Sequence, residues 1–105
     1  MRREIILAPE AEEDLNALKA FDRAAVRDAM EEHLRHEPTK ASRSRIKRLR
    51  GIRRPQYRLR VQEHRVFYDV TEDTVEVLAI VPKSKAAEWL ERYGQAGLEN
   101  EESDS

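Results

Sequence analysis

The fold of this chain is decided by three segments in its second half: YRLRV at residues 57–61, RVFYDV at residues 65–70 and VEVLAIV at residues 75–81. In the first segment the apolar residues Tyr57, Leu59 and Val61 alternate with Arg58 and Arg60. A period of two is typical of a strand with one buried face. Polar residues at 62–64 and 71–74 predict tight turns between the segments. The pattern therefore predicts three consecutive antiparallel strands.

The first half of the chain shows helical periods. Residues 4–8 (EIILA) predict a short strand, and Pro9 followed by acidic residues favours the start of a helix. Val26, Met30 and Leu34 recur at every fourth position, so residues 9–37 predict a helical hairpin. We take Asp22 as the candidate N-cap of its second helix.

The ends of the chain complete the predicted order. Residues 39–45 predict a loop, and residues 83–93 predict a closing helix that Gly94 ends. We expect an α+β domain in the order β-α-α-β-β-β-α, with a small antiparallel sheet, the helical hairpin on one face and a C-terminal helix. Residues 1–94 form this single domain, and residues 95–105 form an acidic tail that we expect to be disordered.

Composition narrows the class of protein. The 105 residues include no Cys, which excludes disulfides and thiolate metal sites, and the three His show no metal-ligand spacing. We therefore expect no metal and no cofactor. The apolar run after the first residues is too short for a signal peptide, and no segment approaches the roughly twenty apolar residues of a membrane span. We expect a cytoplasmic protein that does not bind membranes.

The charges are segregated along the chain. Twelve of the twenty Lys and Arg lie between residues 35 and 65, where only Glu37 and Glu63 oppose them, so this stretch carries a net charge of +10. The residues before and after it are net acidic, and the whole chain has a formal charge of −1. A concentrated positive field attracts polyanions, above all nucleic acid.

Three arginines are predicted to share one site. Arg58 and Arg60 point the same way from one strand, and the hairpin returns Arg65 to a position near Arg60. Lys83 follows the third strand and could join them. Fixed cations of this kind can hold a phosphodiester and stabilise the charge that builds when a 2′-hydroxyl attacks the adjacent phosphate.

Simpler readings of the same residues stay open. Alternating arginines are often only a solvated strand face. His64, Tyr57, Tyr68 and Glu63 are the visible candidates for proton transfer, but the pattern favours a surface role for His64 and a core role for the two tyrosines. Trp89 has the helical spacing of a packing residue.

Four runs carry a family resemblance: IKRLRG at 46–51, YRLRV at 57–61, HRVFYDV at 64–70 and VEVLAIV at 75–81. Their combination resembles the RelE/ParE superfamily of bacterial toxins. For the RelE branch the resemblance implies a microbial RNase-type fold and a metal-independent, ribosome-dependent mRNA endonuclease that arrests growth by inhibiting translation. The basic catalytic residues of that branch would fall on Arg58, Arg60, Arg65 and Lys83, the last in place of an arginine.

The residues around the predicted site give a predicted RNA-binding surface. The cations just upstream extend the positive field, Lys85 follows the third strand, and Trp89 could stack on a base. The predicted RNA-binding residues are therefore Arg45, Lys47, Arg48, Arg50, Lys85 and Trp89. The family's C-terminal tyrosine falls on or near Trp89, which cannot transfer a proton, and a histidine found in other members falls on Pro82.

Partners and alternatives follow from the same family. The implied partners are a cognate antitoxin in a heteromeric complex and mRNA on the ribosome, with DNA contacted only through the antitoxin. Two alternatives remain: a ParE-like inhibitor of DNA gyrase without nuclease activity, and a catalytically degenerate toxin that still binds its antitoxin.

Overall fold

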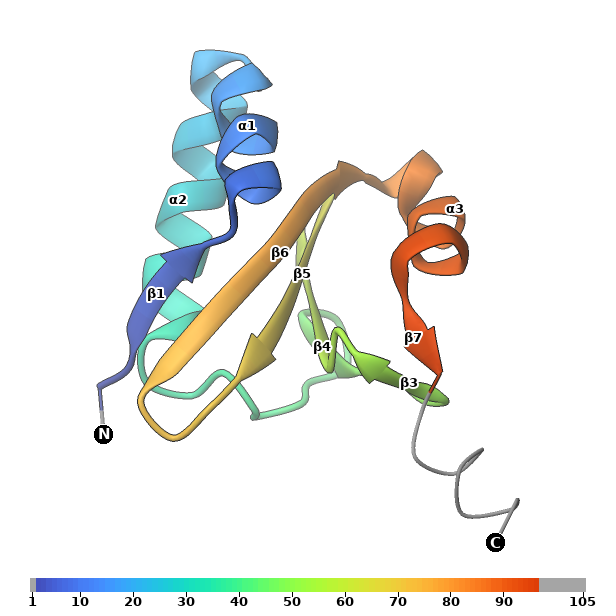
Figure 1. The fold of residues 1–105 in the computed structure, drawn as a ribbon. Helices are drawn as coiled ribbons and strands as arrows, with labels where there is room; N and C mark the ends of the chain where they lie inside the picture. Colours follow the sequence, from blue (N-terminus) through green and yellow to red (C-terminus); the bar gives the residue numbers. More distant parts are fainter. Residues whose placement is uncertain (1, 97–105) are drawn as a thin grey trace, which may run out of the picture.

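The computed structural model describes residues 2–96, which form the expected α+β domain (Figure 1). The elements follow in the order β1 (Glu4–Leu7), α1 (Pro9–Ala17), α2 (Ala20–Leu34), β2 (Ile46–Arg48), β3 (Ile52–Arg54), β4 (Tyr57–Val61), β5 (His64–Val70), β6 (Thr74–Pro82), α3 (Lys83–Tyr93) and β7 (Gln95–Ala96). The four strands and three helices expected from the sequence are present with nearly the expected bounds. The remainder of the predicted tail, residues 97–105, lies outside the described residues.

The main sheet has five strands in the order β1-β6-β5-β4-β2. The pairs β6–β5 and β5–β4 are antiparallel, as expected, and the short strand β2 pairs with β4 in the same way. In contrast, β1 pairs with β6 in parallel, so the sheet is mixed. The short strands β2, β3 and β7 were not predicted. Each has only two or three residues, too few to show a period of two.

The helical hairpin α1–α2 covers one face of this sheet, where the main core lies (Figure 1). Val26, Met30 and Leu34 of α2 are buried there, as their spacing predicted. The expected N-cap is wrong: α2 begins after Lys19, and Asp22 lies inside the helix. The link between the two helices is only Leu18 and Lys19, both extended, so the second helix starts earlier than Asp22.

Helix α3 covers part of the opposite face. None of its residues is buried, and its main anchor is Trp89, whose ring stacks on Phe67 of β5 with centroids 4.9 Å apart and planes 5° apart. Because α3 packs on β6 and on Phe67 of β5, the cationic residues on β4 and at the start of β5 are left beside it. These strands carry the candidate site.

Candidate nucleic-acid interface

Strand register brings four cations onto one face of the sheet. Lys47 lies opposite Arg58 across β2 and β4, and Arg60 lies opposite Arg65 across β4 and β5. Directly opposed residues of antiparallel strands point to the same side. Arg58 also lies opposite Phe67, so this is the side on which α3 packs. We call Lys47, Arg58, Arg60 and Arg65 the cationic face.

Arg65 is held rigidly within this face. Its residue is 6% exposed, and its Nη1 donates hydrogen bonds of 2.9 Å to the carbonyl oxygens of Gln62 and His64 in the β4–β5 turn. Gln62 has a φ of 55°, which turns the chain tightly enough to present both carbonyls. Burial, with a smaller contribution from Arg60, lowers the pKa of Arg65. The guanidinium is therefore oriented by the backbone.

Arg58 and Arg60 differ in exposure. Arg58 is half-buried, and its Nε has no hydrogen-bond partner within residues 2–96. Burial lowers the pKa of Arg58 first, and the charges of Arg65 and Arg60 lower it further. Arg60 is exposed. Over the described range, none of the ion pairs involves Arg58, Arg60 or Arg65. Three neighbouring cations without a paired carboxylate favour the binding of an anion.

Lys83 and Lys85 lie at the start of α3 and are exposed. The backbone N–H of Lys83 donates to the carbonyl of Glu63, which places the start of the helix beside the β4–β5 turn. The Lys83 residue lines a shallow hollow with Glu63 and Ser84. Lys83 therefore lies at the border of the cationic face, next to the turn that orients Arg65.

The upstream cations are divided between surfaces. Arg48 lies on the opposite face from Lys47, with its guanidinium carbon 5.1 Å from the centre of the Tyr57 ring. Arg45 lines a hollow with His33 and Glu37, and Arg50 is exposed in the β2–β3 turn. Of the predicted upstream RNA-binding residues, the register assigns only Lys47 to the cationic face.

Three of the four candidates for proton transfer lie on the other side of the sheet, and the fourth, Glu63, lies beside Lys83 at the border of the cationic face. His64 lies on the helical side, with Nε2 3.8 Å from Oδ2 of Asp22. Tyr57 and Tyr68 stack in the core with ring centroids 5.6 Å apart, and the Tyr68 hydroxyl donates a 2.6 Å hydrogen bond to the carbonyl of Pro38. This core role of the tyrosines agrees with their alternation in the sequence.

Comparison with known proteins gives the family. Residues 5–87 match the family model described as "ParE toxin of type II toxin-antitoxin system, parDE". The chain belongs to this family. No curated protein matches it.

Solved toxin structures share the fold. RelE in the RelB–RelE complex from Methanococcus jannaschii is 19% identical with a TM-score of 0.60, over 80% of this chain and 96% of that chain. The YoeB dimer from Staphylococcus aureus is 17% identical with a TM-score of 0.60, over 77% and 97%. The E. coli DinJ–YafQ toxin–antitoxin complex matches at 14% identity with a TM-score of 0.63, over 83% and 97%. At these identities the likeness concerns the fold alone.

The match to the ParE toxin family covers the cationic face and the first turns of α3. Trp89, Tyr93 and β7 lie after its last residue. Trp89 packs between Phe67 and Tyr93, whose ring centroid is 5.5 Å away. Its position is that of a packing residue that holds α3 on the sheet.

None of the helices within residues 2–96 is long and apolar enough to cross a membrane.

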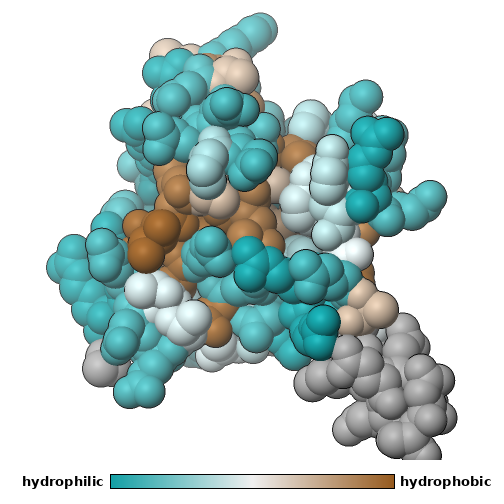
Figure 2. Space-filling model, viewed as in Figure 1, coloured by the Kyte–Doolittle hydropathy of each residue, from teal (hydrophilic) through white to brown (hydrophobic). Residues whose placement is uncertain are grey.

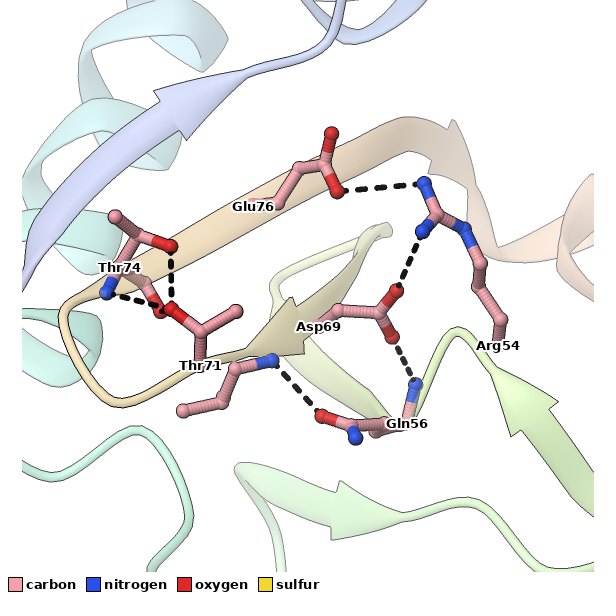
Figure 3. A network of polar contacts seen from close by, with 7 residues as sticks. Arg54, Gln56, Asp69, Thr71, Thr74 and Glu76 are labelled. Carbon is pink, nitrogen blue, oxygen red and sulfur yellow. Dashed lines mark hydrogen bonds and ion pairs between the residues drawn. The ribbon is translucent and has the colours of Figure 1, made fainter.

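Arg54 is held by a network of ion pairs and hydrogen bonds on β5 and β6 (Figure 3). Arg54 pairs with Asp69 at 3.5 Å and with Glu76 at 3.3 Å. Asp69 Oδ1 also accepts a 2.8 Å hydrogen bond from the backbone N–H of Gln56, whose side-chain oxygen accepts from the N–H of Val70. Burial raises the pKa of Asp69, although Gln56 and Arg54 oppose the shift. The sequence did not single out this network, because its residues are far apart in the chain.

A hollow with apolar and charged walls lies between α1 and α3, and Asp14 and Arg54 are among its lining residues (Figure 2). Its volume is about 520 Å³, and it is lined by Leu78, Val81, Trp89 and Tyr93, with Glu10 and Glu13 of α1 at its side. Tyr93, a phenol that is 58% exposed, therefore faces this hollow and the acidic start of α1. The hollow and the cationic face differ in both chemistry and lining residues.

Proposed function

We propose that this ParE-family chain is the toxin of a toxin–antitoxin pair and that it cleaves mRNA on the ribosome without a metal. The observation that carries the proposal is the gathering of Arg58, Arg60 and Arg65 on one face without a paired carboxylate in the described range. Such a cluster fits a single phosphodiester with room for bidentate contacts.

The reaction would use the substrate's own nucleophile. The 2′-oxygen attacks phosphorus, the bond to the 5′-oxygen breaks, and the products are a 2′,3′-cyclic phosphate and a 5′-hydroxyl. Arg65, oriented by two carbonyl groups, would stabilise the charge on the phosphorane oxygens, with Arg58 beside it, and the exposed Arg60 would grip the backbone. Each such donor typically contributes about 10²–10³-fold in rate.

Proton transfer would depend on groups outside this cluster. His64, Tyr57 and Tyr68 face the helical side, which leaves Glu63, beside Lys83, as the remaining candidate. Charge stabilisation and positioning would therefore supply most of the rate enhancement. Loss of general acid–base help costs about 10²–10⁴-fold, which fits an enzyme that requires the ribosome to hold its substrate in line.

The proposed partner is an antitoxin. The RelE, RelBE2 and YafQ structures that share this fold are toxin–antitoxin complexes. In this chain the basic residues 35–65 would bind an acidic antitoxin segment, and contact with DNA would be made only by that antitoxin. The complex would act in the cytoplasm.

Inhibition of DNA gyrase is the second candidate function. Two observations favour it: the description of the matching family, and the orientation of His64, Tyr57 and Tyr68 away from the cationic face. On this reading the same cations would contact a protein–DNA surface and no bond would be cleaved.

Expression without an antitoxin separates the candidates. The assay compares growth, mRNA 5′ ends by primer extension, and gyrase supercoiling with purified protein. Arg60→Gln should reduce the rate of mRNA cleavage at least tenfold. Arg27→Gln, a matched change of an exposed arginine on α2, should leave this rate unchanged. Supercoiling inhibition without new 5′ ends would establish the second candidate. Normal growth with soluble folded protein would overturn both.

A further inference from the structure

We propose that the hollow between α1 and α3 is a second binding site of this chain, and that its ligand is the guanidinium group of an arginine side chain on a partner protein. This ligand has the opposite charge to the phosphodiester proposed for the cationic face. The site would therefore exist whether or not the chain cleaves RNA. Three properties of the hollow support it: an apolar floor, an open aromatic surface and unpaired carboxylates.

The floor of the hollow suits an alkyl stem. Leu78 and Val81 of β6 line it and are only partly buried. Figure 2 shows hydrophobic side chains gathered on the sheet between the helical hairpin and α3. The volume of about 520 Å³ lies within the range of about 300–1,000 Å³ that is typical of ligand pockets. The methylene groups of an arginine would pack on this floor while the charged end stays beside the walls.

Two rings of α3 offer a surface for a planar cation. Trp89 packs on Phe67, and the ring of Tyr93 lies 5.5 Å from the Trp89 ring at an angle of 44°. Trp89 and Tyr93 both line the hollow, and Tyr93 is 58% exposed. Because these two rings are tilted and not stacked face to face, part of their surface stays open to the hollow. A guanidinium group stacks on such rings and is attracted by their negative faces.

The wall formed by α1 carries carboxylates without ion-pair partners. Glu10 and Glu13 line the hollow and are exposed. Over residues 2–96, none of the ion pairs involves either of them. Asp14 adds a third carboxylate, and its Oδ2 accepts a 3.0 Å hydrogen bond from the backbone N–H of Ile80, which fixes its position. Carboxylates accept charge-assisted, often bidentate hydrogen bonds from a guanidinium group.

Arg54 also lines the hollow, but its charge is already offset. Its guanidinium pairs with Asp69 and Glu76 on the neighbouring strands. The negative charges of α1 therefore remain in excess. A carboxylate ligand would be repelled there, and a neutral apolar group would use only the floor. A planar guanidinium fits the floor, the rings and the carboxylates together, whereas the ammonium group of a lysine or a polyamine is a compact, strongly hydrated charge.

The acidic residues of α1 also have a simpler role, because negative charge at the start of a helix stabilises it through the helix dipole. Glu10 and Glu12 share that role, since both lie in the first turn. Glu12 is exposed but is not among the residues that line the hollow. Neutralising Glu12 should therefore leave ligand binding unaltered, whereas neutralising Glu13 should weaken it.

Tryptophan fluorescence tests the proposal, because Trp89 is the only tryptophan of the chain and lines the hollow. The full chain is titrated with three probes. The first is N-acetylarginine amide, and the second is N-acetylcitrulline amide, which has nearly the same shape without the charge. The third is spermidine, a free polyamine. The variants are Glu13→Gln and Tyr93→Leu, with Glu12→Gln as the matched control.

N-acetylarginine amide should change the Trp89 emission and bind about fivefold more tightly than the citrulline derivative, or better. Glu13→Gln and Tyr93→Leu should each raise its Kd about twofold to fivefold, as expected for single exposed contacts, and Glu12→Gln should not. Equal binding of the charged and neutral derivatives, or equal effects of Glu12→Gln and Glu13→Gln, would overturn the site. Tighter binding of spermidine than of the arginine derivative would overturn the assignment to a guanidinium group.

Backbone amide shifts locate the ligand independently of the fluorescence. N-acetylarginine amide should shift the NMR signals of Leu78 and Val81 and leave those of Arg58 and Arg60 on the cationic face in place. Unchanged signals of Leu78 and Val81 at saturating ligand would overturn the proposal, even if the emission of Trp89 changes. None of these measurements involves mRNA cleavage, so a failure of the proposed function would not affect their outcome.

Discussion

Arg60 and Arg65 lie directly opposite each other on β4 and β5, yet their side chains have different environments. Arg60 is exposed, whereas Arg65 is 6% exposed and donates to two backbone carbonyls of the intervening turn. Two like charges at a directly opposed pair of strand positions repel each other. An anion bound between the two guanidinium groups would offset this repulsion.

This difference predicts separable effects on stability and activity. Arg60→Gln should change the free energy of unfolding by less than about 0.5 kcal/mol, as other surface substitutions do. Arg65→Ala should cost about 1–3 kcal/mol, because the carbonyls of Gln62 and His64 lose their donor. Urea unfolding of both variants measures the difference. Equal losses of unfolding free energy in the two variants would contradict the assigned roles. Arg65→Lys should recover only part of the stability lost in Arg65→Ala, because an ammonium group lacks the planar fork of a guanidinium.

The buried hydroxyl of Tyr68 predicts a stability loss at high pH. Burial, with a smaller effect of Tyr57, raises the pKa of Tyr68 above its ordinary value of 10.0. The folded chain therefore holds this proton more tightly than the unfolded chain, so the contribution to stability is complete below pH 10.0 and is lost as the pH rises toward the folded pKa. Tyr68→Phe should cost about 0.5–1.5 kcal/mol at neutral pH and should weaken the loss above pH 10. Denaturant unfolding at about pH 8 and about pH 11 tests this, and identical pH dependence in the two proteins would refute it.

The network around Arg54 predicts opposite shifts from two substitutions. Arg54 lowers the pKa of Asp69, whereas Glu76 raises it. Arg54→Gln should therefore raise the pKa of Asp69 further, and Glu76→Gln should lower it. Because burial has already raised this pKa, the stability contribution of Asp69 is complete below its ordinary pKa of 3.8 and is lost as the pH rises through the folded value. Carboxyl carbon shifts in an NMR titration measure both variants. Shifts in the same direction would show that the charges of Arg54 and Glu76 do not govern Asp69.

The stacking of Trp89 on Phe67 should determine how firmly α3 is attached to the sheet. The helix buries none of its own residues, so the stack of Trp89 on Phe67 is its main attachment. Trp89→Ala should cost about 1–3 kcal/mol, less than the 3–5 kcal/mol typical of a fully buried aromatic residue. Hydrogen exchange should accelerate in α3 and not in β5. Trp89→Phe keeps a stacking ring and should largely restore protection, whereas unchanged exchange in the alanine variant would exclude this anchoring role.

Local patterns predicted most of the fold. Alternation at residues 57–61 and the spacing of Val26, Met30 and Leu34 indicated which side chains face the core, and the structure buries them fully except for Tyr57, which is partly buried. The parallel pairing of β1 with β6 was not predictable, because it joins residues about seventy positions apart and no local period records such a contact. The shortest strands were not predicted for a related reason, because they are defined by hydrogen bonds to distant strands and have no pattern of their own.

Local patterns also predicted part of the candidate site. Arg58, Arg60 and Arg65 were grouped from alternation and hairpin geometry, and the register places them on one face. Arg48 was grouped with Lys47 because the two are adjacent in sequence, but adjacent strand residues point to opposite faces. Without evidence for the short strand β2, the sequence could not divide that basic run.

The sequence by itself determined the class of fold, the buried stripes and the concentration of positive charge, because these depend on residue types at local spacings. Only the tertiary structure decided which cations share a surface and which are engaged by carboxylates, as Arg54 is. Those relationships arise from strand register and from contacts between distant segments, and a linear pattern does not encode either of them directly.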